Sequence, residues 1–289
     1  MKYKDNINGI LVVNKPKGIT SRDVVNKVQK ILNTKAGHTG TLDPLATGTL
    51  VLTLGKATKL SEIITKETKE YEAEAIFGIE TDTLDTEGEI LKEKPSILDK
   101  DEVIKTLNSF KTTYKQEVPK YSAVKIGGKK LYEYARANIE VKLPKKDVTI
   151  YDIKLLDFKI KDNKTIIKFY VKVSKGTYVR SLIRDISQKL NTIGTMSNLK
   201  RISQGKFNID NSFTLEDIEK GNYQIISIKE AIDIPIKEVD DDIKIKILNG
   251  VPLNGEEEKI LFLDENDNEL AIYHKVGTKL KIWKMLYKM

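Results

Sequence analysis

Residues 37–48 of this 289-residue chain, Gly-His-Thr-Gly-Thr-Leu-Asp-Pro-Leu-Ala-Thr-Gly, constrain its fold more than any other segment. Three glycines and a proline do not fit a regular helix or a central strand, so the sequence predicts a loop. Its apolar residues, Leu42, Leu45 and Ala46, would anchor the loop and give it a fixed shape. A single acid, Asp43, lies in the middle. An Asp before Pro is by itself most often a turn former, but a shaped loop with one carboxylate can also place a nucleophile or an acid–base group.

Composition excludes several kinds of active site. The chain has no cysteine, so disulfides, thiol nucleophiles and thiolate metal sites are ruled out. Its two histidines, His38 and His274, lie far apart in the sequence, which argues against a Ser–His–Asp hydrolase and against a histidine-rich zinc site. We expect neither a metal nor a nucleotide cofactor. Reactive chemistry must then come from carboxylates, hydroxyls, tyrosine, lysine or arginine.

The formal net charge of +8 favours a polyanionic partner, because each Lys or Arg placed on a phosphate releases a counterion. Charge alone leaves RNA, DNA and a ribosome-binding role open. No apolar run is long enough for a transmembrane helix, and the apolar stretch at residues 10–13 is too short for a signal peptide. We therefore expect a cytoplasmic protein with one large domain and a small one.

The hydrophobic pattern predicts an α+β domain followed by a small β-rich module. Strands are expected at residues 10–13, 50–54, 71–77, 148–158 and 165–173, and helices near residues 20–32, 55–64, 103–110 and 177–190. Thr177 is expected to cap the last helix. The order lacks a strict βαβ rhythm, which favours a mixed, largely antiparallel sheet flanked by helices. Residues 237–242 are interpreted as a charged connector, and three short strands follow at residues 259–263, 270–274 and 279–283. We therefore divide the chain into residues 1–235 and 236–289.

Two further segments combine cations with aromatic residues. Residues 119–136 interleave lysines and tyrosines, among them Tyr121 and Lys125. This pattern fits a basic turn and a helix with inward tyrosines, or an RNA-gripping element in which cations meet phosphates and rings stack on bases. Residues 174–181, Ser-Lys-Gly-Thr-Tyr-Val-Arg-Ser, put Tyr178 and Arg180 at a helix N-terminus, where an arginine is ordinarily a surface residue.

Taken together, these segments resemble the TruB family of tRNA pseudouridine synthases. Residues 37–48 closely resemble its catalytic loop, and residues 15–21, Lys-Pro-Lys-Gly-Ile-Thr-Ser, fit its first motif. The order Tyr-Ser-Ala-x-Lys…Tyr-x-x-Ala-Arg within residues 119–136 recurs in the family. Residues 199–207 resemble its Leu-Arg-Arg…Gly-x-Phe segment. The motifs span roughly residues 10–207, and the C-terminal part looks like the family's PUA-type RNA-binding module.

The resemblance implies a pseudouridine-synthase-like fold and conversion of uridine 55 to pseudouridine in the TΨC arm of tRNA. It implies that Asp43 is the nucleophile, that Arg180 pairs with it, and that Tyr71 stacks on a flipped-out uracil. Contacts to substrate or RNA are implied for a second group: His38, Lys15, Tyr121, Lys125, Tyr178, Leu199, Lys200 and Arg201. We expect a monomer that binds tRNA and does not associate with a membrane.

Two other classes of function stay open. One is an RNA-binding protein without catalysis, such as a tRNA-folding helper or a ribosome-associated factor. The other is a guide-RNA-dependent pseudouridine synthase of the dyskerin type. The pair Leu45 and Ala46 resembles the stand-alone bacterial form. Departures from the family pattern occur at Glu80, Ala137 and Lys200, and none involves the three catalytic positions.

Overall fold

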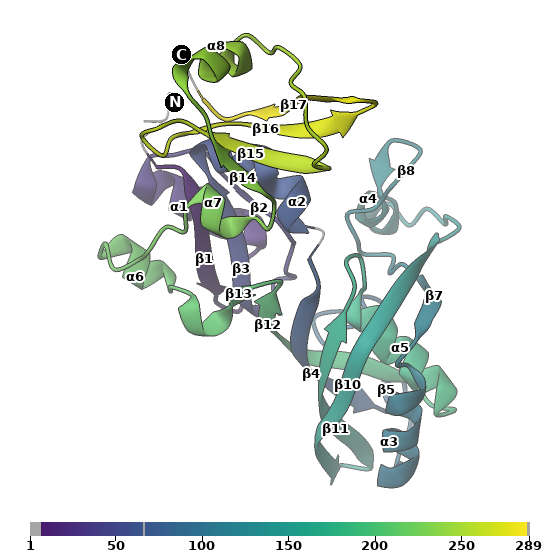
Figure 1. Ribbon diagram of the computed structural model, residues 1–289. Coiled ribbons are helices and arrows are strands. Elements are labelled where there is room, and N and C mark those ends of the chain that lie inside the picture. Colours follow the sequence, from purple (N-terminus) through teal and green to yellow (C-terminus); the bar gives the residue numbers. More distant parts are fainter. Residues whose placement is uncertain (1–6, 66, 288–289) are drawn as a thin grey trace.

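The structure is a computed structural model that describes residues 7–65 and 67–287. The first six residues, at the start of the segment considered for a signal peptide, lie outside this range. The main sheet is built from β1 (Gly9–Lys15), β2 (Ala36–His38), β3 (Thr47–Leu54), β4 (Lys69–Phe77), β7 (Thr113–Glu117), β10 (Lys145–Lys161), β11 (Lys164–Val173), β12 (Gly194–Gln204) and β13 (Phe207–Asn208). Within the described residues these strands form one nine-stranded sheet, ordered β1-β3-β12-β4-β11-β10-β7, with β2 beside β3 and β13 beside β12 (Figure 1).

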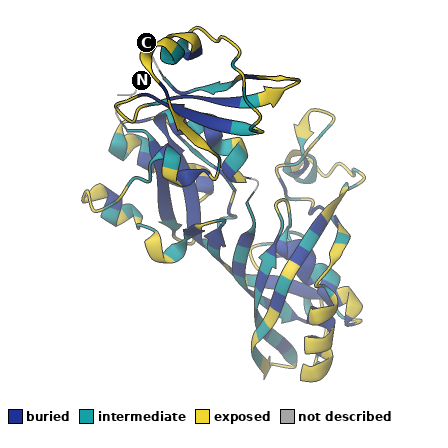
Figure 2. Ribbon diagram, in the orientation of Figure 1, coloured by how far each residue is buried: buried dark blue, intermediate teal, exposed yellow. Residues whose placement is uncertain are grey.

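This sheet confirms the predicted mixed, largely antiparallel architecture. In the described chain β3 and β12 make its one parallel pair, and every other pairing along the path is antiparallel. Alternation along β4 buries Tyr71, Ala73, Ala75 and Phe77 on one face. The main core lies on that face, where three helices pack. They are α1 (Ser21–Leu32), α3 (Lys100–Ser109) and α5 (Val179–Lys189). Figure 2 shows that β1 and β3 are also buried along most of their length.

Shorter elements connect these parts. They are η1 (Gly55–Leu60), α2 (Ser61–Thr65), β5 (Ile79–Thr81), β6 (Ile90–Glu93), β8 (Lys125–Ile126), β9 (Lys129–Lys130), α4 (Leu131–Arg136), η2 (Ile209–Asn211), α6 (Leu215–Glu219) and α7 (Ile228–Ala231). No helix in the described part of the chain has the length and apolar character needed to span a bilayer.

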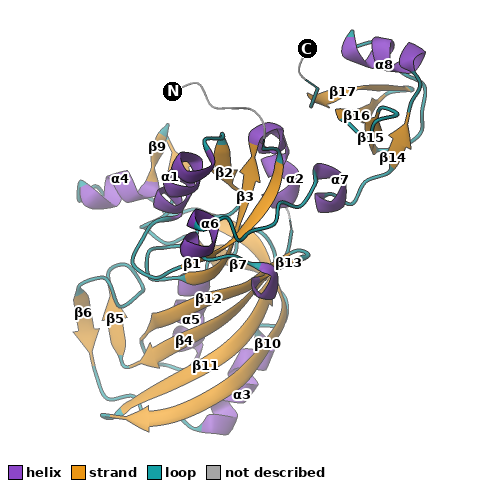
Figure 3. Cartoon of the chain, turned by 90° about the vertical axis from the view of Figure 1, so that its left-hand side faces the viewer, coloured by secondary structure: helices purple, strands orange, loops and turns teal. Residues whose placement is uncertain are grey.

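The C-terminal module is a separate sheet, ordered β14-β15-β16-β17 (Figure 3). Its elements are β14 (Ile236–Glu238), α8 (Asp241–Leu248), β15 (Lys259–Leu263), β16 (Glu269–Val276) and β17 (Lys279–Met285). The three predicted strands are confirmed. The prediction of a charged connector at residues 237–242 is wrong. Residues 237 and 238 belong to β14, which pairs with β15, and Asp240 is the N-cap residue of α8. Backbone pairing and capping do not require apolar side chains, so the hydrophobic pattern could not indicate either.

The loop prediction for residues 37–48 is wrong at both ends. Gly37 and His38 belong to β2, and Thr47 and Gly48 begin β3, so the irregular part is residues 39–46. Gly48 has a φ of 98° and pairs with Arg201 of β12. A Cβ atom there would lie 2.3 Å from the Arg201 carbonyl oxygen. This glycine therefore allows β12 to pack against the strand, and it does not break the strand.

The predicted cap of α5 is also wrong. The N-cap residue is Tyr178, which caps the helix without a side-chain hydrogen bond. The Thr177 hydroxyl donates instead to the Ser174 carbonyl oxygen at 2.9 Å and closes the preceding turn. At the N-terminus of α1 the cap is regular: Thr20 is the N-cap residue and forms a capping box with Asp23.

Candidate active site

The Asp43 loop has a fixed shape because it is fastened from several sides. Leu42, Leu45 and Ala46 are buried in the main core, as the sequence predicted. The Leu42 amide donates to Ser21 Oγ at 2.8 Å, and that hydroxyl donates to the Leu42 carbonyl oxygen at 2.9 Å. Asp43 is therefore preceded by a residue that is packed and hydrogen-bonded to the start of α1.

Two buried cations hold the loop from beneath. Lys15 Nζ donates to the carbonyl oxygens of Ala46 at 2.6 Å and Pro44 at 3.3 Å. Arg201 donates from Nη2 to the Gly40 carbonyl oxygen at 2.9 Å. Its Nε donates to the Thr49 carbonyl oxygen at 2.6 Å. Neither side chain is exposed, so we assign both to holding the loop, in place of the RNA contacts that the resemblance implied.

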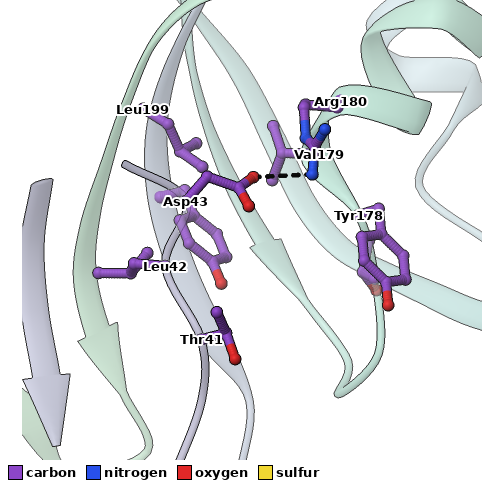
Figure 4. A pocket seen from close by; sticks show the side chains of 9 residues that line it. Thr41, Leu42, Asp43, Tyr178, Val179, Arg180 and Leu199 are labelled. Carbon is purple, nitrogen blue, oxygen red and sulfur yellow. Dashed lines mark ion pairs between the residues drawn. The ribbon is translucent and has the colours of Figure 1, made fainter. Parts of the chain in front are cut away.

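Arg180 and Asp43, which are far apart in the sequence, form an ion pair. Arg180 Nη2 lies 3.0 Å from Asp43 Oδ2 (Figure 4). The same guanidinium donates to the Thr83 carbonyl oxygen at 2.8 Å and to the Tyr121 carbonyl oxygen at 3.1 Å. The Arg180 side chain is buried, whereas that of Asp43 is 36% exposed. A buried arginine fixed by backbone carbonyls can orient the carboxylate while leaving it accessible.

A second carboxylate contacts Arg180, and the sequence did not indicate it. Asp85 Oδ2 lies 3.6 Å from Arg180 Nη1, and the Asp85 side chain is only 7% exposed. Its other oxygen accepts from the Thr83 hydroxyl at 2.7 Å and the Glu87 amide at 3.1 Å. Residues 81–88, Thr-Asp-Thr-Leu-Asp-Thr-Glu-Gly, contain two other acids, and no local pattern distinguishes this aspartate from them.

Asp43 and Arg180 lie in the wall of one pocket. Its walls are Thr41, Leu42, Asp43, Tyr71, Thr177, Tyr178, Val179, Arg180 and Leu199. Asp43 points across the pocket at Arg180, with Leu42 and Leu199 on its own side and Tyr178 beyond (Figure 4). The structure thus brings together five of the predicted site residues: Asp43, Tyr71, Tyr178, Arg180 and Leu199. Acidic, aromatic and apolar groups facing one cavity can hold a planar base beside a nucleophile.

Burial shapes the protonation of groups around the pocket. Burial raises the pKa of the Tyr178 phenol, which therefore carries its proton at neutral pH. Burial lowers the pKa of His38, and the nearby Arg201 and Arg22 lower it further. His38 is accordingly neutral near pH 7. Burial also lowers the pKa of Lys15 to about 8, although Asp43 opposes the shift.

The other predicted contacts lie outside the pocket lining. His38 is in β2, just before the loop, and its Nδ1 is buried without a partner among the described residues. Lys200 is exposed on β12, between the buried Leu199 and Arg201. Lys125 is exposed in the β8–β9 hairpin. Tyr121 reaches the site through its backbone, because its carbonyl oxygen accepts from Arg180.

Among residues 7–65 and 67–287, no group of three or more histidines and carboxylates is arranged to hold a metal ion.

Family models place the chain among the pseudouridylate synthases. Residues 28–179 match the model described as "TruB family pseudouridylate synthase (N terminal domain)". Residues 180–240 match "tRNA pseudouridylate synthase B C-terminal domain". The border between the two matches falls inside α5, so it does not mark a structural boundary.

Curated relatives agree over nearly the whole length. The chain is 40% identical to the tRNA pseudouridine synthase B of Bacillus licheniformis, covering 96% of both chains. It is 41% identical to that of Bacillus subtilis strain 168, covering 96% of this chain and 93% of the relative. The chain therefore belongs to the TruB family.

Solved structures confirm the fold. A Cbf5-Nop10-Gar1 complex matches with a TM-score of 0.71 at 24% identity, covering 96% of this chain and 85% of that chain. An H/ACA RNP bound to a substrate RNA containing 2'-deoxyuridine matches with the same TM-score at 22% identity, covering 97% and 85%.

Proposed function

We propose that this chain converts uridine 55 in the TΨC arm of tRNA to pseudouridine, as a monomer and without a guide RNA. The relatives named tRNA pseudouridine synthase B support tRNA as the substrate. The observation that carries the mechanism is the ion pair between Arg180 and Asp43 at the wall of a pocket that also contains Tyr71. A pure RNA-binding protein has no need of a buried arginine that orients one accessible carboxylate.

Asp43 is the nucleophile in this proposal. Its Oδ2 pairs with Arg180, and Oδ1 has no hydrogen-bond partner within the described chain, so that oxygen can attack. The electrophilic carbon is C1′ of the ribose or a carbon of the pyrimidine ring. By either route the bond from C1′ to N1 breaks and a bond from C1′ to C5 forms. The proton leaves C5 and N1 gains one, so the reaction needs no redox partner.

Tyr71 and Leu199 enclose the flipped uracil. Uridine in a folded arm must leave its stack to reach Asp43, and a stacking surface lowers the cost of that step. Tyr71 supplies the aromatic face, and its hydroxyl takes part in moving the C5 proton. Leu199 supplies an apolar wall, and neutral His38 occupies or steadies the position that the base leaves.

Residues 1–235 carry the chemistry in this proposal, and residues 236–289 form a PUA-like module that binds RNA. The module's β16 and β17 carry Lys275, Lys279, Lys281 and Lys284. Phosphate contacts from such lysines would fix the register of the tRNA and make its affinity salt-dependent. Exposed Lys125 and Lys200 would add phosphate contacts from the catalytic domain, and Tyr121 would contact the RNA as well.

The decisive experiment is incubation of the purified chain with an unmodified tRNA transcript, followed by mapping of pseudouridine. We expect modification at position 55 without added RNA, and none with Asp43→Asn, which keeps the size of the side chain but removes its charge. The Asn variant should still bind tRNA. Normal turnover by that variant would refute the nucleophile. Binding without modification by the wild type would favour an RNA-binding protein, and activity only with added guide RNA would favour the dyskerin type.

A further inference from the structure

The C-terminal sheet has two apolar faces. One face packs under α8 and includes Phe262 and Tyr273. The other face, which includes Leu261 and Ile272, shares a cluster with residues of the catalytic domain. Trp283, the single tryptophan of the chain, is half-buried at the edge of this second cluster. Part of its indole therefore stays accessible beside the junction of the two domains.

Cations surround this indole. The ammonium groups of Lys259 and Lys284 lie 5.3 Å and 4.9 Å from the ring centroid. The His274 ring lies 6.4 Å away, tilted by 34°. Lys244 and Lys275 in the same module pair with carboxylates. Within the described residues neither Lys259 nor Lys284 has such a partner.

This arrangement matches the chemistry of an unstacked nucleotide. Both ammonium groups lie near one ring, so they are at most about 10 Å apart and repel each other. The indole attracts each cation only weakly, whereas a phosphate would neutralise them. An aromatic face beside cations is how proteins bind single-stranded nucleic acid, because any base can stack on the ring.

The site is distant from the catalytic loop. The module contacts η1 and α2, where Lys59 Nζ donates to the Met285 carbonyl oxygen at 2.5 Å. These elements follow the C-terminal end of β3, whereas the Asp43 loop enters β3 at Thr47. Eight residues of strand correspond to about 25 Å. A nucleotide on Trp283 is therefore not the one that faces Asp43.

We propose that Trp283, Lys259 and Lys284, with His274 beside them, bind one unpaired nucleotide of the tRNA outside the TΨC arm. The base stacks on the indole and its phosphate lies on the two ammonium groups. This inference rests on the proposed function, since it assumes that tRNA is the substrate. It adds a second point of recognition, which sets affinity for whole tRNA and has no part in the chemistry.

Because the chain has one tryptophan, its fluorescence reports this site in the intact protein. We expect a saturable change in Trp283 emission on titration with an unmodified tRNA transcript, and no change with the isolated TΨC stem–loop. Pseudouridine formation is measured on the same samples. If tRNA is modified at position 55 but the emission does not change, the site is wrong while the function stands. If the isolated arm changes the emission, the nucleotide belongs to that arm and the inference is also wrong.

Variants test the site independently. Lys259→Gln with Lys284→Gln leaves the apolar cluster intact and should raise KM for tRNA about tenfold with kcat unchanged. KM for the isolated arm should not change. Trp283→Leu should act in the same way, and Trp283→Phe should restore much of the affinity because it keeps a ring. The matched control is Lys237→Gln with Lys246→Gln, which removes two exposed charges of the same module. An equal rise in KM for tRNA in that control would show that the effect comes from net charge alone, and would refute the site.

Discussion

Lys15 and Arg201 hold the Asp43 loop from inside the protein, each with its cation on backbone carbonyl oxygens. Both side chains are fully buried. Their charges are not on the surface where a phosphate would lie, so we propose that they support the reaction by fixing where Asp43 lies. The backbone of Arg201 also pairs with Tyr71 on one side and Gly48 on the other. Arg201 of β12 thus links β4, which carries Tyr71, to β3, which follows the Asp43 loop.

Substitutions of the neighbouring residues Lys200 and Arg201 should therefore have different effects. Arg201→Met releases the Gly40 carbonyl of the loop and the Thr49 carbonyl of β3. We expect kcat to fall about 10- to 100-fold with tRNA affinity nearly unchanged. Lys200→Met removes an exposed cation, and we expect weaker tRNA binding, with a salt slope lower by about 1, and an unchanged kcat. Single-turnover kinetics and binding titrations separate the two, with circular dichroism to show that both variants fold. A loss of affinity confined to Arg201→Met would contradict the assignment.

Lys15 should make stability depend on pH. Its pKa is about 8 in the folded chain against an ordinary 10.5, so between these values the unfolded chain holds a proton that the folded chain has lost. The cost of burying the charge is fully present below pH 8 and is relieved as the pH rises. Relative to Lys15→Met, the wild type should gain at most about 1.4 kcal/mol per pH unit in this window. Urea unfolding at pH 7 to 10 measures this difference, with exposed Lys17→Met as the charge-matched control. If the free energies of unfolding of the wild type and Lys15→Met changed with pH by the same amount, the prediction would be wrong.

Local patterns predicted much of this architecture. Alternation revealed the buried face of β4, and helical spacing revealed α1 and α5, because each pattern reflects a single element against one core. The strand β12 was not predicted. It carries Asn198, Lys200 and Arg201 and therefore lacks a clean apolar pattern, yet it lies inside the sheet, between β3 and β4. Arg201 is accommodated because its Nε and Nη2 donate to the carbonyl oxygens of Thr49 and Gly40, which the strand meets only after folding.

The site could be predicted only in part for a related reason. Asp43 was indicated by the unusual composition of its own loop. Its pairing with Arg180 was implied only by the family resemblance, since no local signal joins two distant segments. The family resemblance implied RNA contacts for Lys15 and Arg201, and only the fold shows that both side chains are buried. Asp85 gave no signal at all.

Arg180 should matter through its shape as well as its charge. It contacts two carboxylates and two carbonyls, which a single ammonium cannot reproduce. For Arg180→Lys we expect kcat to fall about 100-fold with little change in tRNA affinity. Asp85→Asn keeps the size of the side chain and should cost about tenfold in kcat, since Arg180 keeps its other partners. A main effect on affinity in either variant would make Arg180 a phosphate ligand.

Tyr71→Phe separates the two roles proposed for the tyrosine. The ring is buried in β4 and lines the pocket, so the variant should fold and still stack on the base. Loss of the hydroxyl should abolish release of the C5 proton, which is measured as tritium set free from 5-tritiated uridine in tRNA. Full tritium release by Tyr71→Phe would leave Tyr71 a stacking surface and move the base to another group.

Gly48 should tolerate no side chain. At its φ of 98°, a Cβ atom would lie 2.3 Å from the backbone oxygen of Arg201, which cannot move without separating β3 from β12. Strain and clash together should lower the free energy of unfolding by about 3 kcal/mol or more in Gly48→Ala. Gly176 is the matched control, because its φ of 81° carries the same backbone penalty but nothing lies within 4 Å of the added atom. Gly176→Ala should cost only about 1 kcal/mol. Urea unfolding of both variants measures the difference, and equal losses would show that close approach of β12 is not what requires glycine at residue 48.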